Sequence, residues 1–199
     1  MNSMRTQKNS GFALLLSLII SSVVLAIGVS ILHISVNQIN LAATARESEL
    51  AFQAAHAGID CQWYWCIERA FEYVTATAPT ENPNISCFGE NSIADPDEPE
   101  VQRFPPTSGT GYVDQFLNTF QWGSPARCTR TAMYVLNNTG QLTNMSVTFP
   151  NHEGVGNNGV KVCDAGSVCT VLISAGHNRA CDELESTIFS VQRELTVEF

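Results

Sequence analysis

An uncharged run of 21 residues, from Phe12 to Leu32, limits what this chain can fold into more than any other feature. As a helix it reaches about 31 Å, at about 1.5 Å per residue, which matches the hydrocarbon thickness of a bilayer. Arg5 and Lys8 are the only charges before this run, and the next full charge is Arg46. The sequence therefore predicts one membrane-spanning helix, which continues without a break into a less apolar helical segment.

Three interpretations of this N-terminus are open. A cleaved secretory signal usually has an apolar core of about 7–15 residues with a small-residue site close behind, but Ala43-Thr44-Ala45 lies about a dozen residues past a longer core. An uncleaved signal anchor would keep Arg5 and Lys8 inside the cell and export the remainder. A prepilin leader would be cut after Gly11, ahead of the apolar helix, so that the helix is retained.

The segment from Lys8 to Leu16 resembles the class III signal of type IV pilins and pseudopilins, with a basic leader, a glycine before the cut and a phenylalanine after it. The segment from Glu49 to Ile59 is similar to the stretch that follows the membrane helix in minor pilins. The resemblance covers residues 1 to 61. It implies cleavage after Gly11 by a prepilin peptidase, methylation of the new Phe12 amine, and helix-to-helix assembly with other pilin or pseudopilin subunits.

The fifth residue of such a mature chain is Leu16, where major pilins usually carry a glutamate. That glutamate can neutralise the terminal amine of a neighbouring subunit inside the apolar filament core. A leucine improves the membrane helix, because a buried carboxylate without a partner is costly. Within the family it favours a minor subunit at a filament tip. Small residues suited to close helix contact in lipid are Ser17, Ser21, Ser22, Ala26, Gly28 and Ser30.

Length and charge fit an exported domain behind this helix. About 130 residues lie beyond the long helix, enough for one compact domain. We expect a leader at 1–11, a transmembrane helix at 12–32, an amphipathic continuation at 33–76 and a β-rich extracytoplasmic domain at 77–199. The formal net charge is −9, and −11 without Arg5 and Lys8. This acidity argues against a nucleic-acid partner, because phosphate binding needs a basic surface.

Seven cysteines behind a membrane helix indicate an oxidising compartment. If residues 61–66 are helical, the Cα atoms of Cys61 and Cys66 lie more than about 8 Å apart, which is too far for a disulfide. These two cysteines should therefore reach different partners. Cys163 and Cys169 could close locally across a turn. The odd count leaves at least one thiol unpaired or shared between subunits. The candidates are Cys61, Cys66, Cys87, Cys128, Cys163, Cys169 and Cys181.

An apolar stripe at three- and four-residue steps predicts that the helix runs on to Ala76 and packs on a sheet. Gly58 lies in this segment and indicates close packing, and Pro79 ends the run. The opposite face is polar at Gln53, Asp60, Glu68 and Glu72. The stripe consists of Phe52, Ala55, Ile59, Trp63, Cys66, Ala70 and Val74.

Residues 79–125 read as a turn-rich connector, rich in proline, in which Tyr112, Phe116, Phe120 and Trp122 suggest a short helical segment. Alternating apolar residues predict strands at 145–149, 169–174 and 189–199, with a weaker candidate at 131–136 before a turn at 137–140. Strands separated by turns predict an antiparallel sheet that includes the C-terminal strand. The fold class is therefore α+β.

No enzyme motif stands out, and we predict no catalytic residue, metal or cofactor and no small-molecule substrate. Cys169, His177 and Cys181 lack the paired C-x2-C spacing of structural zinc sites, so disulfides are the better interpretation. The acidic stretch from Asp95 to Glu100 favours a solvated loop over a calcium site.

The leading hypothesis is a minor type IV pilin or pseudopilin. It would be held in the cytoplasmic membrane by one span, with its C-terminal domain outside, and would reach the cell surface after assembly. The alternative is a signal-anchored surface binding domain outside any filament, and an enzyme with a cysteine–histidine site comes third.

Overall fold

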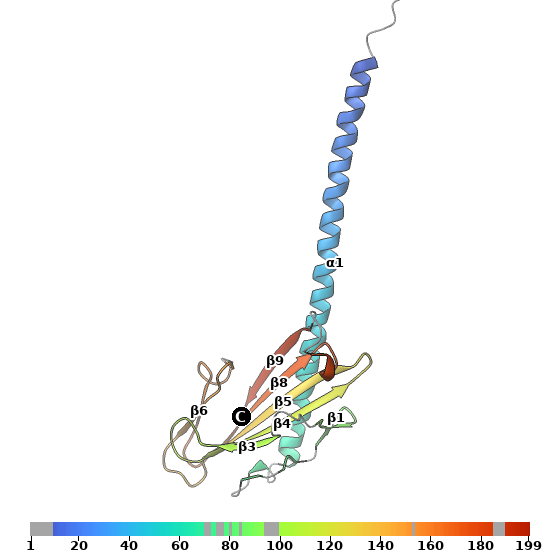
Figure 1. The fold of residues 1–199 in the computed structure, drawn as a ribbon. Helices are drawn as coiled ribbons and strands as arrows, with labels where there is room; N and C mark the ends of the chain where they lie inside the picture. Colours follow the sequence, from blue (N-terminus) through green and yellow to red (C-terminus); the bar gives the residue numbers. More distant parts are fainter. Residues whose placement is uncertain are drawn as a thin grey trace, which may run out of the picture. The chain divides into compact units, whose positions relative to one another are not determined.

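The computed structural model describes residues 10–69, 73–74, 78–79, 81–83, 85–93, 100–152, 154–184 and 190–199. These residues form one long helix, α1 (Ser10–Glu68), and an antiparallel sheet, an α+β fold (Figure 1). The chain divides into two compact units, Met1–Arg46 and Glu47–Phe199. The second unit contains the last six turns or so of α1 and every described strand, since about 3.6 residues make a turn.

A five-stranded, fully antiparallel sheet forms the centre of the second unit, in the order β3-β4-β5-β8-β9. A hairpin of β6 (Met145–Thr148) and β7 (Val160–Cys163) is inserted between β5 and β8, and a small hairpin of β1 (Ser86–Cys87) and β2 (Glu90–Asn91) precedes β3. A short 3-10 helix, η1 (Cys181–Glu183), follows β8. The sheet strands are β3 (Val101–Phe104), β4 (Tyr112–Trp122), β5 (Arg127–Asn137), β8 (Val168–His177) and β9 (Gln192–Glu198).

The two faces of the sheet bury different clusters, because successive side chains of a strand point to opposite faces. On one face, Phe116 and Leu172 pack against Ile59 of α1. On the other, Leu136 and Ile173 belong to a cluster with residues of the β6–β7 hairpin. The sheet therefore lies between residues 47–68 of α1 and the inserted hairpin, which cover different faces.

The helix and the sheet approach each other closely at two glycines, Gly58 of α1 and Gly176 of β8. A Cβ atom on Gly58 would lie 2.4 Å from the Ser174 side chain, and one on Gly176 would lie 2.1 Å from the backbone nitrogen of Ala55. Neither distance leaves room for a methyl group. Both elements must lack side chains at this point for the two backbones to approach so closely.

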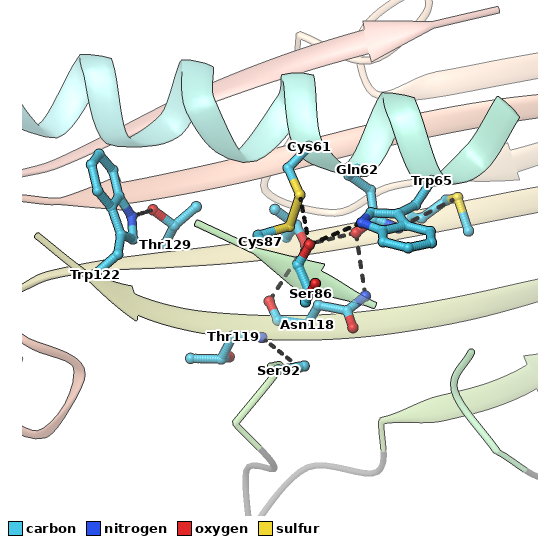
Figure 2. The surroundings of a disulfide bond; sticks show 12 residues. Cys61, Gln62, Trp65, Ser86, Cys87, Ser92, Asn118, Thr119, Trp122 and Thr129 are labelled. Carbon is cyan, nitrogen blue, oxygen red and sulfur yellow. Dashed lines mark hydrogen bonds between the residues drawn. A yellow bond between two sulfur atoms is a disulfide. The ribbon is translucent and has the colours of Figure 1, made fainter. Parts of the chain in front are cut away.

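A buried polar residue, Gln62, stabilises the same interface beside these glycines. Its side chain is 1 % exposed. Its carbonyl oxygen accepts a hydrogen bond from Asn118 Nδ2 at 3.3 Å (Figure 2). It accepts a second one from Thr131 Oγ1 at 3.1 Å. Because a buried carbonyl needs donors, this contact sets the position of α1 along β4 and β5.

The apolar stripe expected on this part of the helix is only partly buried. Ala55, Ile59 and Cys66 are buried as predicted, but Phe52 and Trp63 are 43 % and 37 % exposed. The buried face also contains Ala51, Ala54, Gly58 and Gln62. At about 100° per residue its centre is turned by about 70° from the centre of the predicted stripe. Close packing on the sheet favours small residues in the buried face of α1, so the larger apolar side chains lie at the edge of that face.

Several strand predictions are confirmed and one local prediction is wrong. Residues 145–148 and 192–198 are strands, residues 169–174 lie within β8, and residues 131–136 lie within β5. The segment from Tyr112 to Trp122, expected to be a short helix, is β4, paired along its whole length with β5. Its aromatic residues recur at steps of two or four positions, a spacing that fits a strand as well as a helix. Pairing with the neighbouring strands selected the extended form.

The helix and connector predictions are also changed in detail. Helix α1 ends at Glu68 rather than Ala76, and residues 70–72 and 75–77 lie outside the described residues. The supposed connector contains β3 and β4, so it supplies two strands of the sheet. Residues 95–99 of the acidic stretch, and Phe189 of the last predicted strand, lie outside the described residues.

We predict that alanine at either glycine of the interface destabilises the second unit. Gly176→Ala should lower the free energy of unfolding by about 3 kcal/mol, because backbone atoms face the new methyl group. Gly58→Ala should cost somewhat less, because alanine recovers about 1 kcal/mol of helix propensity. Denaturant titration of the full chain in detergent, followed by the fluorescence of Trp63, Trp65 and Trp122, measures both.

Gly28→Ala is the matched control in the same helix, because no atom lies within 4 Å of the Cβ it would gain. It should leave the unfolding free energy unchanged or slightly raised. Equal stability of all three variants would contradict the close approach.

We also predict that stability falls as the solution becomes acidic. Burial, reinforced by the positive charge of Arg130, lowers the pKa of His177 below its usual 6.5. The unfolded chain then takes up a proton more readily, so the unfolding free energy should decrease as pH falls below about 6.5. His177→Gln should flatten this part of the pH profile, measured by denaturant titration.

His56→Gln serves as the control, because His56 is exposed on α1, and this variant should keep the acid-dependent slope of the wild type.

A further loss of unfolding free energy is expected below pH 4.5. There, burial opposes ionisation of Glu198, but hydrogen bonds from Lys161 and the Gly156 N–H outweigh it and lower the pKa of Glu198. If His177→Gln kept the slope of the wild type near pH 6.5, His177 would not be the source of the acid-dependent loss of stability.

Candidate functional site

The first candidate functional surface is the apolar part of α1 within the first unit. Residues 12–46 are exposed throughout, and the large apolar side chains among them are mostly between half and three-quarters exposed. Among the described residues, α1 is the one helix long and apolar enough to cross a membrane, with a mean hydropathy of 2.7 over its most apolar 18 residues. Such a surface needs an apolar environment that the chain itself does not provide.

Several hydroxyl side chains in this stretch are hydrogen-bonded within the helix. Ser17 Oγ donates to the Leu14 carbonyl at 2.9 Å, Ser22 Oγ to the Ile19 carbonyl at 2.8 Å, and Ser30 Oγ to the Ala26 carbonyl at 2.8 Å. A hydroxyl bonded to a carbonyl one turn earlier needs no water. The helix is thus compatible with a hydrocarbon environment, in which unsatisfied polar groups are costly.

The residues predicted for helix assembly do not share one face. Taking Ser17 as the origin and about 100° per residue, Ser21 and Gly28 lie within about 40° of it, whereas Ser22 and Ala26 lie about 140–180° away. Leu16 lies between the two groups and is 49 % exposed. The helix therefore offers two faces of small residues on opposite sides, and none of the residues that the structure describes covers either face.

The predicted processing position lies at the start of α1. The helix begins at Ser10, so Gly11 and Phe12 belong to its first turn, and the Phe12 side chain is 74 % exposed. The remainder of the basic leader, residues 1–9, lies outside the described residues.

Six of the seven cysteines form three disulfides. Cys61 joins Cys87, Cys128 joins Cys181, and Cys163 joins Cys169. These bonds link α1 to β1, β5 to η1, and β7 to β8. The local closure expected between Cys163 and Cys169 is confirmed. Cys61 and Cys66 are not joined to each other, as expected, but only Cys61 has a partner. Cys169 and Cys181, which the sequence analysis weighed as zinc ligands, lie in two different disulfides.

The remaining cysteine, Cys66, is unpaired and buried at 7 % exposure. It packs with Ile59, Phe116 and Leu172 in the cluster under α1. Burial raises the pKa of this thiol above its usual 9.0. A thiol enclosed in this way behaves as a small apolar side chain, and within this chain it is unpaired.

A cavity of about 150 Å³ lies on the face of the sheet opposite α1. Leu117, Ala132 and Ile173 contribute to its lining, and a close pair of His152 Nδ1 and Glu194 Oε1, 2.7 Å apart, stands at its side. Small-molecule sites usually occupy about 300–1,000 Å³, so this cavity is small for one. Among the described residues, no three His, Cys, Asp or Glu side chains gather in a way that could hold a metal ion.

The sequence analysis did not identify Gln62, which lies in the helix–sheet interface, or the pair of His152 and Glu194 beside the cavity. Gln62 was hidden within a helix whose pattern suggested only an apolar face. His152 and Glu194 are 42 residues apart and come together because the loop after β6 crosses the sheet near β9. No local signal marks such a pair, since each residue alone resembles an ordinary surface residue.

No family model matches the chain, and no curated protein or solved structure is significantly similar to it. Function is therefore inferred from the apolar helix, from the domain that follows it and from the sequence around Gly11.

We predict that Cys66 reacts only when the domain unfolds. In the native chain without reductant, iodoacetamide should modify no thiol rapidly, because burial and the raised pKa keep Cys66 from forming an accessible thiolate. In denaturant it should modify one thiol per chain, measured by intact mass. Cys66→Ser should abolish that modification. Two or more labelled thiols, or rapid native labelling, would contradict the assigned pairing.

Proposed function

We propose that this chain is a minor type IV pilin or pseudopilin, a structural subunit that is anchored in the cytoplasmic membrane and assembled into a pilus or secretion pseudopilus. The observation that carries the proposal is the exposed apolar stretch of α1, which begins at Phe12, directly after Gly11, and continues without interruption into the part of the helix that packs on the sheet.

The exposed stretch supports a subunit that moves between two apolar environments. Residues 12–32 match the thickness of a bilayer, and the same surface can pack against like helices in a filament. The two opposite faces of small residues, one with Ser17 and Gly28 and the other with Ser22 and Ala26, suit a helix that contacts neighbours on both sides. A simple signal anchor needs apolar character but has no need for small residues on opposite faces.

Leu16 supports a minor rather than a major subunit. A glutamate at this position would form an ion pair with the terminal amine of the next subunit, and a leucine offers no such partner. A subunit at a filament tip has no neighbour ahead of it, so it needs no carboxylate there. Leucine also avoids the cost of placing an unpaired charge in hydrocarbon.

The second unit suits an oxidising, extracytoplasmic compartment. Three disulfides tie α1, the hairpins and the sheet together, and such bonds persist outside the reducing cytosol. In this proposal the domain lies outside the cytoplasmic membrane, the partners are other pilin subunits and a prepilin peptidase, and the protein is not an enzyme.

We predict that Gly11 is essential for processing and assembly. In native cells the intact mass of the chain should correspond to a protein that starts at Phe12 with one added methyl group. Gly11→Leu should keep its leader and be absent from sheared filaments, because the peptidase needs a small residue before the cut. Gly28→Ala should be processed like the wild type.

An untrimmed N-terminus in the wild type would instead identify a signal anchor. Normal trimming and polymerisation of Gly11→Leu would overturn the pilin assignment.

A further inference from the structure

The outer edge of β9 carries unpaired backbone groups. Thr170 and Phe199 exchange two backbone hydrogen bonds, of 2.7 and 3.1 Å, which sets the alternation along the β8–β9 ladder. In an antiparallel pair every second residue bonds inward, so Glu194, Thr196 and Glu198 direct their N–H and C=O groups outward. Within the described part of the chain, no strand pairs with β9 on that side. In Figure 1, β9 forms one edge of the sheet.

This edge lacks the protection that sheet edges usually have. Native edge strands are typically short, contain proline or a bulge, or present free charges. The opposite edge strand, β3, has four residues and is followed by Pro105 and Pro106. In contrast, β9 has seven residues, no proline and an unbroken register with β8.

The charged side chains of β9 do not block pairing at this edge either, because they form interactions on the two faces of the sheet. Their partners are Ser48 for Arg193, His152 for Glu194, and Lys161 and the Gly156 N–H for Glu198. The backbone edge between these side chains is left open.

Exposed apolar side chains of α1 lie beside the same edge. The Trp63 ring packs edge-on against Phe199 with centroids 4.2 Å apart, which places Trp63 on the β9 side of the helix. Phe52, about three turns earlier, lies within about 20° of Trp63 around the helix axis. These are the residues of the apolar stripe that the sheet leaves exposed. A sixth strand, about 4.8 Å beyond β9, would reach the space next to them.

Charge decides what kind of strand fits this edge. Glu47 is the first acid of the chain, so residues 47–199 contain all 19 acids with 7 of the 10 basic residues, a net charge of −12. A second copy would be repelled, and antiparallel self-pairing centred on Thr196 would set Glu194 opposite Glu198. A basic partner is attracted instead.

We propose that the outer edge of β9 accepts an extended segment of another protein as a sixth strand. Alternate side chains of that segment are apolar and lie beside Phe52 and Trp63, and the intervening ones are basic and lie on the face that carries Glu194 and Glu198. This site does not depend on cleavage at Gly11, so it stands or falls independently of the pilin assignment.

The test uses the full chain in detergent micelles and a capped peptide in which lysine and valine alternate over nine residues. The peptide should bind, and hydrogen exchange at the amides of Glu194, Thr196 and Glu198 should slow by about tenfold or more. The amides of Leu195 and Val197, already bonded to β8, should change little. A peptide of the same composition without alternation should bind at least about tenfold more weakly. Absence of binding, or equal binding of both peptides, would overturn the proposal.

Two further arms isolate the backbone edge. Thr196→Pro removes an outward N–H without breaking a bond to β8, and it should abolish peptide binding, whereas the matched variant Thr196→Val should retain it. Should Thr196→Pro fail to fold, a peptide N-methylated at the amides that face β9 tests the same bonds on the wild type, and it should not bind. Binding that persists with the methylated peptide, or dimerisation of the chain through β9 that the alternating peptide does not displace, would overturn the proposal.

Discussion

The close contact between α1 and the sheet is the constraint on which the second unit depends. Gly58 faces Ser174 and Gly176 faces Ala55 with no space for a methyl group at either position, and the buried Gln62 carbonyl finds its two donors only when the helix sits at this depth. A helix held farther out would separate the Gln62 carbonyl from both donors and leave Asn118 Nδ2 without its acceptor, at a cost of about 1–3 kcal/mol for each buried group. Steric fit and hydrogen bonding therefore select the same position.

The disulfides reinforce this arrangement rather than create it. Cys61–Cys87 ties α1 to the β1 hairpin next to the hydrogen bond from Trp65 Nε1 to the Ser86 carbonyl (Figure 2). Closing a loop of 26 residues removes about 3–4 kcal/mol of chain entropy from the unfolded state in the entropic account. The second unit is thus a small, covalently braced domain with a single buried thiol. The apolar stretch of α1 in the first unit has no such internal support and depends on its surroundings.

The proposed function and the proposed strand-binding edge arise from surfaces that the fold leaves uncovered. Residues 12–46 expose apolar side chains that a bilayer or neighbouring helices would cover. The β9 edge, with Phe52 and Trp63 beside it, exposes backbone groups and rings that an added strand would cover. In the proposed function the first surface would serve anchoring and assembly, and the second would recruit a different partner.

The sequence alone determined the long helix, the α+β class and the terminal strand, because a 21-residue uncharged run favours a continuous helix and alternating apolar residues favour a strand. It also indicated the local closure of Cys163 with Cys169. It did not determine β4, the rotation of α1 or the pairing of Cys61 with Cys87. Those features depend on contacts between residues far apart in the chain, such as Gly58 with Ser174 and Gln62 with Asn118 and Thr131. Only the tertiary structure decided which face of the helix is buried, because the space available at the sheet outweighed the apolar pattern of the helix itself.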